Sequence, residues 1–130
     1  MSGPLLDRFD ITIEVPATYN FDEKKNFKTN KSSKEIKEQV ISARKIQEKR
    51  FNGLGIKTNN QMTSNIIGDY ARLSNEAEKI LNDAANKFKF SMRGYYRAIK
   101  LARTIADLDN SININKIHIS ESINYRIITF

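Results

Sequence analysis

Two periodicities of apolar residues divide this chain. Near its start, Ile11, Ile13 and Val15 alternate with Thr12 and Glu14, and a period of two is typical of a β-strand. Farther along, apolar residues recur every three or four positions, which predicts α-helices that each bury one face. A single strand lacks partners for its backbone hydrogen bonds, and no second good strand follows it. The pattern therefore predicts a helical domain that carries one strand of another domain.

Serine and glycine residues mark where the predicted helices begin and end. Ser32 stands three residues before a glutamate, the spacing of a capping box, and the helix that follows should end at the glycine-containing turn 52–55. Ser74 and Ser91 are predicted to cap two further helices. The predicted helices span residues 33–51, about 66–73, 75–88, 92–108 and about 115–126.

Each predicted helix has an apolar stripe that we expect to face the core. The stripes comprise Ile36, Val40, Ala43, Ile46 or Gln47, and Phe51; Ile66, Ile67, Tyr70 and Leu73; Ala77, Ile80, Leu81, Ala84, Ala85 and Phe88; Tyr95 or Tyr96, Ile99, Ala102, Ile105 and Ala106; and Ile119, Ile123 and Tyr125. Helices with one apolar face each predict an all-α fold, a small helical bundle. The polar, aperiodic stretch 17–31 predicts a mobile basic connector between strand and bundle.

Composition narrows the class of protein. The 130 residues include 22 Lys or Arg and 15 Asp or Glu, and this formal net charge of +7 favours a nucleic-acid partner or is simply a lysine-rich solvated surface. The absence of cysteine excludes disulfides and thiolate metal sites and is compatible with a cytoplasmic location. No run approaches the roughly 18 apolar residues of a membrane-spanning helix, and no secretory signal is visible.

Catalytic motifs are missing from this sequence. It has no HExxH, CxxC, EF-hand or GxxxxGK[ST] pattern, so neither a metal site nor a phosphate-binding loop is predicted. The single histidine, His118, lies in a predicted surface helix with no Ser or Cys nucleophile at a recognisable spacing, so we interpret it as solvated or partly packed. We therefore expect the chain alone not to hydrolyse ATP.

Several stretches of the sequence together resemble one family. They are SGPLLDRFDITIEVP (residues 2–16), the SS, I, V, AR, Q and R positions within residues 32–50, and SMRGYYRAIKLARTIADL (91–108) followed by HISESINYR (118–126). This combination is similar to the C-terminal portion of the magnesium-chelatase-like AAA+ ATPases, specifically the competence-protein ComM (YifB) branch. The resemblance covers nearly the whole chain and is most specific at its two ends.

The resemblance implies an organisation in three parts. Residues 1–16 would be the final strand of an α/β nucleotide-binding core with its arginine-finger motif, residues 17–31 the linker, and residues 32–130 a helical AAA+ lid. The rest of the core would carry the P-loop and the acidic Mg²⁺ motif. ATP and Mg²⁺ would therefore act in the full-length parent, and no cofactor is expected on the isolated chain.

The resemblance also implies roles for two residues beside the predicted strand. Arg8 matches the arginine finger, which reaches into the nucleotide site of the neighbouring subunit, where a guanidinium can neutralise charge on the γ-phosphate. Asp7 would help to hold the subunit interface. The alternative is that Asp7 and Arg8 orient the start of a strand or form a surface pair.

Arg93 lies in the first turn of the helix that Ser91 is predicted to cap. A cation is locally unfavourable there because of the helix dipole, unless an anion docks at the same helix start. The resemblance matches Arg93 to the sensor-2 arginine, which detects the bound nucleotide from the lid, and Arg97, one turn later, would support it. The alternative is an exposed arginine without this role.

Other candidates along the same region have structural interpretations. Arg103 and Asp107 are four residues apart and can pair along the helix. Tyr95 and Tyr96 could stack on bases, but core packing is the expected role of at least one of them. Arg126 matches the end motif of the family and has no further role than a cation near a helix C-terminus.

Two functions are compatible with these features. By resemblance, the parent would be a cytoplasmic ATPase that forms a ring of six subunits, the missing nucleotide-binding core included, and that moves DNA branches during recombination. Alternatively, the chain is a stand-alone basic nucleic-acid-binding module. In that case Lys24, Lys25, Lys28 and Lys31 would bind phosphates, with a steep dependence of affinity on salt.

Overall fold

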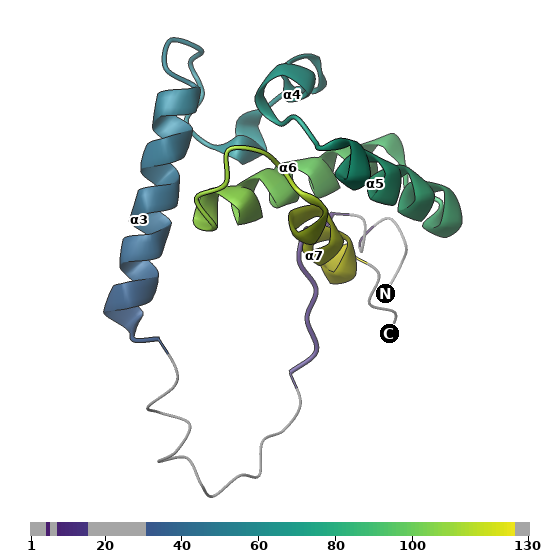
Figure 1. The fold of residues 1–130 in the computed structure, drawn as a ribbon, viewed down its shortest axis with the longest axis horizontal. Helices are drawn as coiled ribbons and strands as arrows, with labels where there is room; N and C mark the ends of the chain where they lie inside the picture. Colours follow the sequence, from purple (N-terminus) through teal and green to yellow (C-terminus); the bar gives the residue numbers. More distant parts are fainter. Residues whose placement is uncertain (1–4, 6–7, 16–30, 127–130) are drawn as a thin grey trace, which may run out of the picture.

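The computed structural model describes residues 5, 8–15 and 31–126, and within them the fold is all-α, as predicted. Its elements are α3 (Ser33–Arg50), the 3₁₀ turn η1 (Asn59–Gln61), α4 (Ser64–Tyr70), α5 (Asn75–Phe88), α6 (Met92–Leu108) and α7 (Lys116–Arg126), shown in Figure 1. The order and approximate limits of the predicted helices are confirmed. The turn η1 lies in a stretch for which the pattern predicted a connector alone.

The predicted capping serines are all used. The hydroxyl oxygens of Ser32, Ser74 and Ser91 accept hydrogen bonds from backbone N–H groups in the first turns of α3, α5 and α6, with donor–acceptor distances of 3.2, 3.2 and 3.0 Å. These bonds satisfy amides that have no partner within the helix. After α3 the chain turns at Gly53 and Gly55, whose φ angles of 84° and 75° favour glycine.

Helix α6 is the centre of the bundle. It packs against α7, α3, η1 and α4, and α7 packs in turn against α5. Three fully buried alanines on α6, Ala98, Ala102 and Ala106, let neighbouring elements approach closely. The rest of the core consists of Phe51, Met62, Ile67, Ala71, Ala77, Leu81, Ile99, Ile114, Ile119 and Ile123.

A parallel bridge closes the bundle between the α4–α5 and α6–α7 connections. Leu73 pairs with Ile114, and the backbone N–H of Ser74 donates to the carbonyl oxygen of Ile114 at 2.9 Å. This bond joins the start of α5 to the segment that leads into α7, although the two lie about 40 residues apart in the sequence. The bridge therefore fixes the relative position of the two helices.

The predicted core face is wrong at three positions. Ile36 and Val40 on α3 are 50% and 43% exposed, and Phe88 at the end of α5 is 45% exposed. Figure 1 shows the reason for α3: its N-terminal half extends away from the other helices, so its apolar stripe continues beyond the part that contacts α6. Periodicity identifies the face of a helix but not the length over which that face is covered.

Residues 11–15, predicted as a strand, form neither a helix nor a strand with the other described residues. The backbone N–H of Thr12 donates to the carbonyl oxygen of Tyr125 at the end of α7, at 3.0 Å. The predicted linker 17–31, apart from Lys31, lies outside the described residues, as do Asp7 and residues 127–130. The limits of the predicted domains stay predictions.

Among the described helices, none is both long enough and apolar enough to cross a membrane.

Candidate functional site

The predicted functional arginines lie on or beside α6. Arg93 is exposed in the first turn of this helix, and Arg97 is half-buried one turn later. Within the part of the chain that the structure describes, Arg93 forms no ion pair. It lies next to a helix start, a position that favours anions.

Arg97 binds the N-terminal segment of the chain. Its Nη1 donates to the carbonyl oxygen of Arg8 and to Oδ1 of Asp10, the latter at 3.1 Å. The side chains of Arg97 and Asp10 are 22% and 44% exposed, so the ion pair is partly screened by water. The main chain at Arg8 is therefore held against α6, while the side chain of Arg8 is exposed.

Lys100 lies on the same face of α6, one turn beyond Arg97. Its Nζ donates to the carbonyl oxygen of Asn60 at 3.1 Å, which ties α6 to η1. A small cavity of about 90 Å³ lies between these groups and is lined by Asp10, Asn60, Arg97, Lys100, Leu101 and Thr104. Burial lowers the pKa of Lys100, Arg97 lowers it further, and Asp10 opposes both.

A polar cluster is buried where α3 meets α6. Asp107 is fully buried and accepts hydrogen bonds from Nη1 and Nη2 of Arg50, at 2.9 and 2.5 Å, in a two-pronged contact. Nδ2 of Asn59 donates to the same carboxylate at 2.8 Å, and the backbone N–H of Asn59 donates to Oε1 of Gln47 at 3.0 Å. The cluster therefore holds α3, η1 and α6 together.

Arg103 completes the cluster, and its predicted pairing with Asp107 is confirmed. Its Nε donates to Oδ1 of Asp107 at 3.2 Å, while Nη1 and Nη2 donate to the carbonyl oxygens of Ile112 and Ser111 at 2.8 and 2.6 Å. Burial lowers the pKa of Arg103, Asp107 raises it, and Arg50 lowers it. The guanidinium groups of Arg50 and Arg103 thus share one carboxylate. Backbone carbonyl oxygens accept the remaining hydrogen bonds of Arg103.

The prediction of a surface position for His118 is wrong, because this residue is 3% exposed. Its Nδ1 accepts a hydrogen bond from the backbone N–H of Asn115 at 3.0 Å, and its Nε2 lies 2.8 Å from Oδ2 of Asp109. Because Nδ1 accepts, Nε2 is the ring nitrogen that donates to Asp109. His118 connects the start of α7 to the end of α6 and has a structural role.

The remaining candidates pack against the core. Tyr95 and Tyr96 are half-buried with their rings edge to face, 5.9 Å apart, and the Tyr95 hydroxyl donates to Asn82 at 2.9 Å. Both tyrosines lie against the core cluster, which confirms the expected packing role. The guanidinium of Arg126 lies 5.7 Å from the centre of the Phe90 ring, so a cation–π contact joins the end of α7 to the α5–α6 connection.

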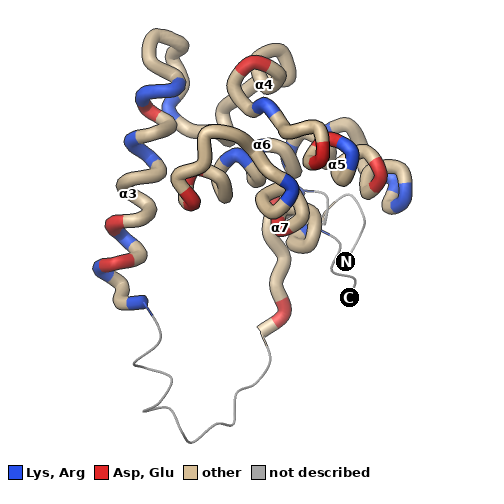
Figure 2. Tube along the Cα trace, in the orientation of Figure 1, with Lys and Arg blue, Asp and Glu red and all other residues tan. Residues whose placement is uncertain are grey.

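The charges of the described residues are interspersed along α3 and α5, where Figure 2 shows acidic and basic positions alternating. No group of three or more His, Cys, Asp or Glu side chains that could hold a metal ion occurs among residues 5, 8–15 and 31–126. On α6, Arg93 is exposed, whereas Arg97 binds Arg8 and Asp10 and Arg103 is buried against Asp107.

Comparison with known proteins identifies the family. Residues 30–126 match the family described as magnesium chelatase, subunit ChlI C-terminal. The chain is 35% identical over 126 residues to competence protein ComM of Haemophilus influenzae, and 36% and 32% identical over 128 residues to YifB of Escherichia coli and of Salmonella typhimurium. These matches cover 97–98% of the chain but 24% of each relative.

The chain belongs to the magnesium chelatase ChlI C-terminal family, and within it is similar to ComM and YifB. The resemblance stated from the sequence is thereby confirmed. The chain spans about a quarter of the length of the relatives it matches.

Proposed function

We propose that this chain is the lid and subunit-interface part of a ComM-like AAA+ ATPase that acts on DNA. Arg8 serves as the arginine finger for the nucleotide site of a neighbouring subunit, with Asp7 at the interface, and Arg93 serves as the sensor-2 arginine. The observation that carries the proposal is the match to this family over residues 30–126, together with the exposed guanidinium groups of Arg8 and Arg93.

ATP is the substrate in this proposal, and the chain contributes cations to its phosphates. The exposed guanidinium of Arg8 donates to γ-phosphate oxygens as charge spreads over them during transfer. Arg93 and the free amides in the first turn of α6 bind a phosphate through charge and the helix dipole. A Mg²⁺ ion would supply further neutralisation of the phosphates, and the nucleotide-binding core would hold both its ligands and the P-loop.

The role of Arg8 in a neighbouring site also implies an assembly of subunits. A finger that acts in a neighbouring site requires an adjacent subunit, and the family resemblance implies a ring of six subunits. The assembled ATPase would use ATP hydrolysis to drive branch migration on DNA in the cytoplasm.

The test is ATP hydrolysis by a chimera in which this chain replaces the matching 24% of H. influenzae ComM. We expect Arg8→Ala to lower kcat about 10³-fold, the scale of arginine fingers, and Arg93→Ala to raise the KM for ATP. Arg44→Ala is the matched control, because Arg44 is exposed on α3, a helix that holds none of the residues proposed to contact the nucleotide, and it should leave both constants unchanged.

Mixing two inactive chimeras tests action in a neighbour's site. The Arg8→Ala chimera is combined with one that lacks the P-loop lysine, and partial recovery of hydrolysis is expected. Full activity of both Arg8→Ala and Arg93→Ala would overturn the arginine roles. Tight, steeply salt-dependent DNA binding by this chain alone would instead favour the stand-alone nucleic-acid-binding module.

A further inference from the structure

Arg97 was predicted to support the sensor-2 arginine, but its guanidinium faces the N-terminal segment. Nη1 donates both to the main-chain carbonyl of Arg8 and to the Asp10 carboxylate. A group that already makes two hydrogen bonds of this kind is poorly placed to reach a nucleotide as well. The contact holds the main chain of the proposed finger, and it leaves the side chain of Arg8 exposed.

A second bond fixes the direction of the same segment. The backbone N–H of Thr12 donates to the carbonyl oxygen of Tyr125 at the end of α7, at 3.0 Å. Two anchors four residues apart along the segment determine both its position and its path across the α6–α7 pair. Because α6 packs against α7 along the bundle, the two anchors belong to one rigid support.

We propose that Arg97 is a positioning residue for the arginine finger: by binding the Arg8 carbonyl and Asp10, it fixes Arg8 relative to Arg93, so that finger and sensor move as one unit with α6. The inference rests on the proposed function for the roles of Arg8 and Arg93. A shift of α6 when Arg93 binds phosphate is then transmitted directly to Arg8. Loss of the contact uncouples the two arginines without removing either of them.

The first arm of the test uses this chain alone and does not depend on ATP hydrolysis. Hydrogen exchange of the Thr12 amide reports whether the segment is held. Arg97→Met, which keeps most of the side-chain stem, should accelerate that exchange about tenfold, because a charge-assisted bond and an ion pair are lost together. Asp10→Asn should accelerate it about threefold, since the bond to the Arg8 carbonyl remains.

Two controls and a double variant complete this arm. Lys100→Met removes the next cation on the same helix face, whose bond goes to Asn60, and Glu14→Gln removes an exposed carboxylate of the same segment. Both should leave Thr12 exchange unchanged. In the Arg97→Met background, Asp10→Asn should have no further effect. Unchanged exchange in Arg97→Met would overturn the contact itself.

The second arm measures ATP hydrolysis in the chimera with H. influenzae ComM. A positioning role predicts that Arg97→Met lowers kcat about tenfold with little change in the KM for ATP, and that it adds nothing in the Arg8→Ala background. Arg97→Lys should recover part of the loss, because an ammonium can still donate to both oxygens. A raised KM, or an effect that persists without Arg8, would overturn the proposal and assign Arg97 to the nucleotide.

The two arms separate the failure of this inference from that of the proposed function. A chimera that hydrolyses ATP and depends on Arg8, yet tolerates Arg97→Met, contradicts the positioning role alone. A chimera whose hydrolysis is indifferent to Arg8 contradicts the proposed function, and the exchange of the Thr12 amide still decides whether Arg97 holds the segment.

Discussion

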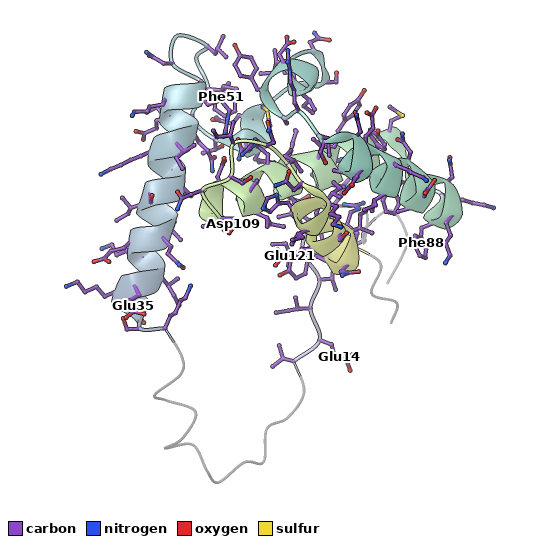
Figure 3. All side chains as sticks on the ribbon, in the orientation of Figure 1. Glu14, Glu35, Phe51, Phe88, Asp109 and Glu121 are labelled. Carbon is purple, nitrogen blue, oxygen red and sulfur yellow. The ribbon has the colours of Figure 1, made fainter. Side chains whose placement is uncertain are left out.

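The two halves of α3 have the same helical backbone but different surroundings. Residues 33–42 are exposed without exception, whereas Ala43 and Gln47 are buried and Arg50 reaches the buried carboxylate of Asp107. Figure 3 shows Glu35 at the free end of the helix and Phe51 at the end that joins the bundle. The inner half is thus held by tertiary contacts, and the outer half by its own backbone hydrogen bonds and the Ser32 cap.

This difference shows that an apolar stripe on a helix can be buried by another element but is not necessarily buried. Ile36 and Val40 lie on the same face as Ala43 and Gln47, but the described residues contain nothing that covers them, and an open depression of about 430 Å³ separates this half of α3 from the end of α6. Stability should therefore respond strongly to changes in the inner half and weakly to changes in the outer half.

The largest effect is expected from Asp107→Asn, which removes the charge that the half-buried guanidinium of Arg50 and the buried guanidinium of Arg103 share. Arg50 and Arg103 would then lack a counter-charge, and we expect a loss of about 3–5 kcal/mol in the free energy of unfolding, measured by urea denaturation. Asp83→Asn on the exposed side of α5 is the matched control. A loss below about 1 kcal/mol would mean that the cluster contributes little to holding α3.

A smaller loss is expected from Gln47→Ala in the inner half. Its Oε1 accepts the hydrogen bond of the Asn59 amide, so truncation leaves a buried N–H without a partner and costs about 1–3 kcal/mol. Gln39→Ala makes the same chemical change in the outer half, where the side chain is exposed. Equal losses from the two substitutions in urea denaturation would contradict the contrast between the halves.

Replacing each of two N-cap serines compares losses in the free energy of unfolding of about 1 kcal/mol or less. Ser74→Ala removes the cap of α5, which packs against α7, and should lower the free energy of unfolding by about 1 kcal/mol. Ser32→Ala should instead accelerate hydrogen exchange in the first turns of α3 and barely change global stability. A full global loss from Ser32→Ala would show that the whole of α3 unfolds as one unit with the bundle.

The smallest effect is expected from Ile36→Ser combined with Val40→Ser. Both side chains are exposed, so the free energy of unfolding should change by less than about 0.5 kcal/mol in thermal or urea denaturation. Ile99→Ser on α6 is the control, with a loss of several kcal/mol expected for a buried aliphatic residue. A substantial loss from the α3 pair would mean that this face is covered in solution.

In the candidate site, the identities of the residues could be predicted from the sequence, whereas their long-range contacts could not. Arg8, Arg93 and Arg97 were identified because short motifs match a family and because an arginine in the first turn of a helix is locally unfavourable. The contact of Arg97 with Arg8 and Asp10 could not be predicted, because it joins residues almost 90 positions apart. The same holds for Arg50 and Asp107, which are 57 positions apart.

Local sequence was sufficient to predict the helices, their approximate limits and their N-terminal caps. Ser32, Ser74 and Ser91 begin helices because a short side chain satisfies amides within the next turn, an interaction that needs no other part of the chain. The period of the apolar residues gave the faces of α6 and α7, because those faces are covered along their length. The family also followed from contiguous motifs.

Tertiary contacts settled which of those faces are buried and which polar groups share the interior. His118 is buried because the loop before α7 brings its ring to Asp109, and Ile36 is exposed because α3 is longer than the surface it contacts. Neither outcome is encoded in local spacing. Burial depends on the lengths and relative positions of separate elements, and these are defined only when the chain has assembled.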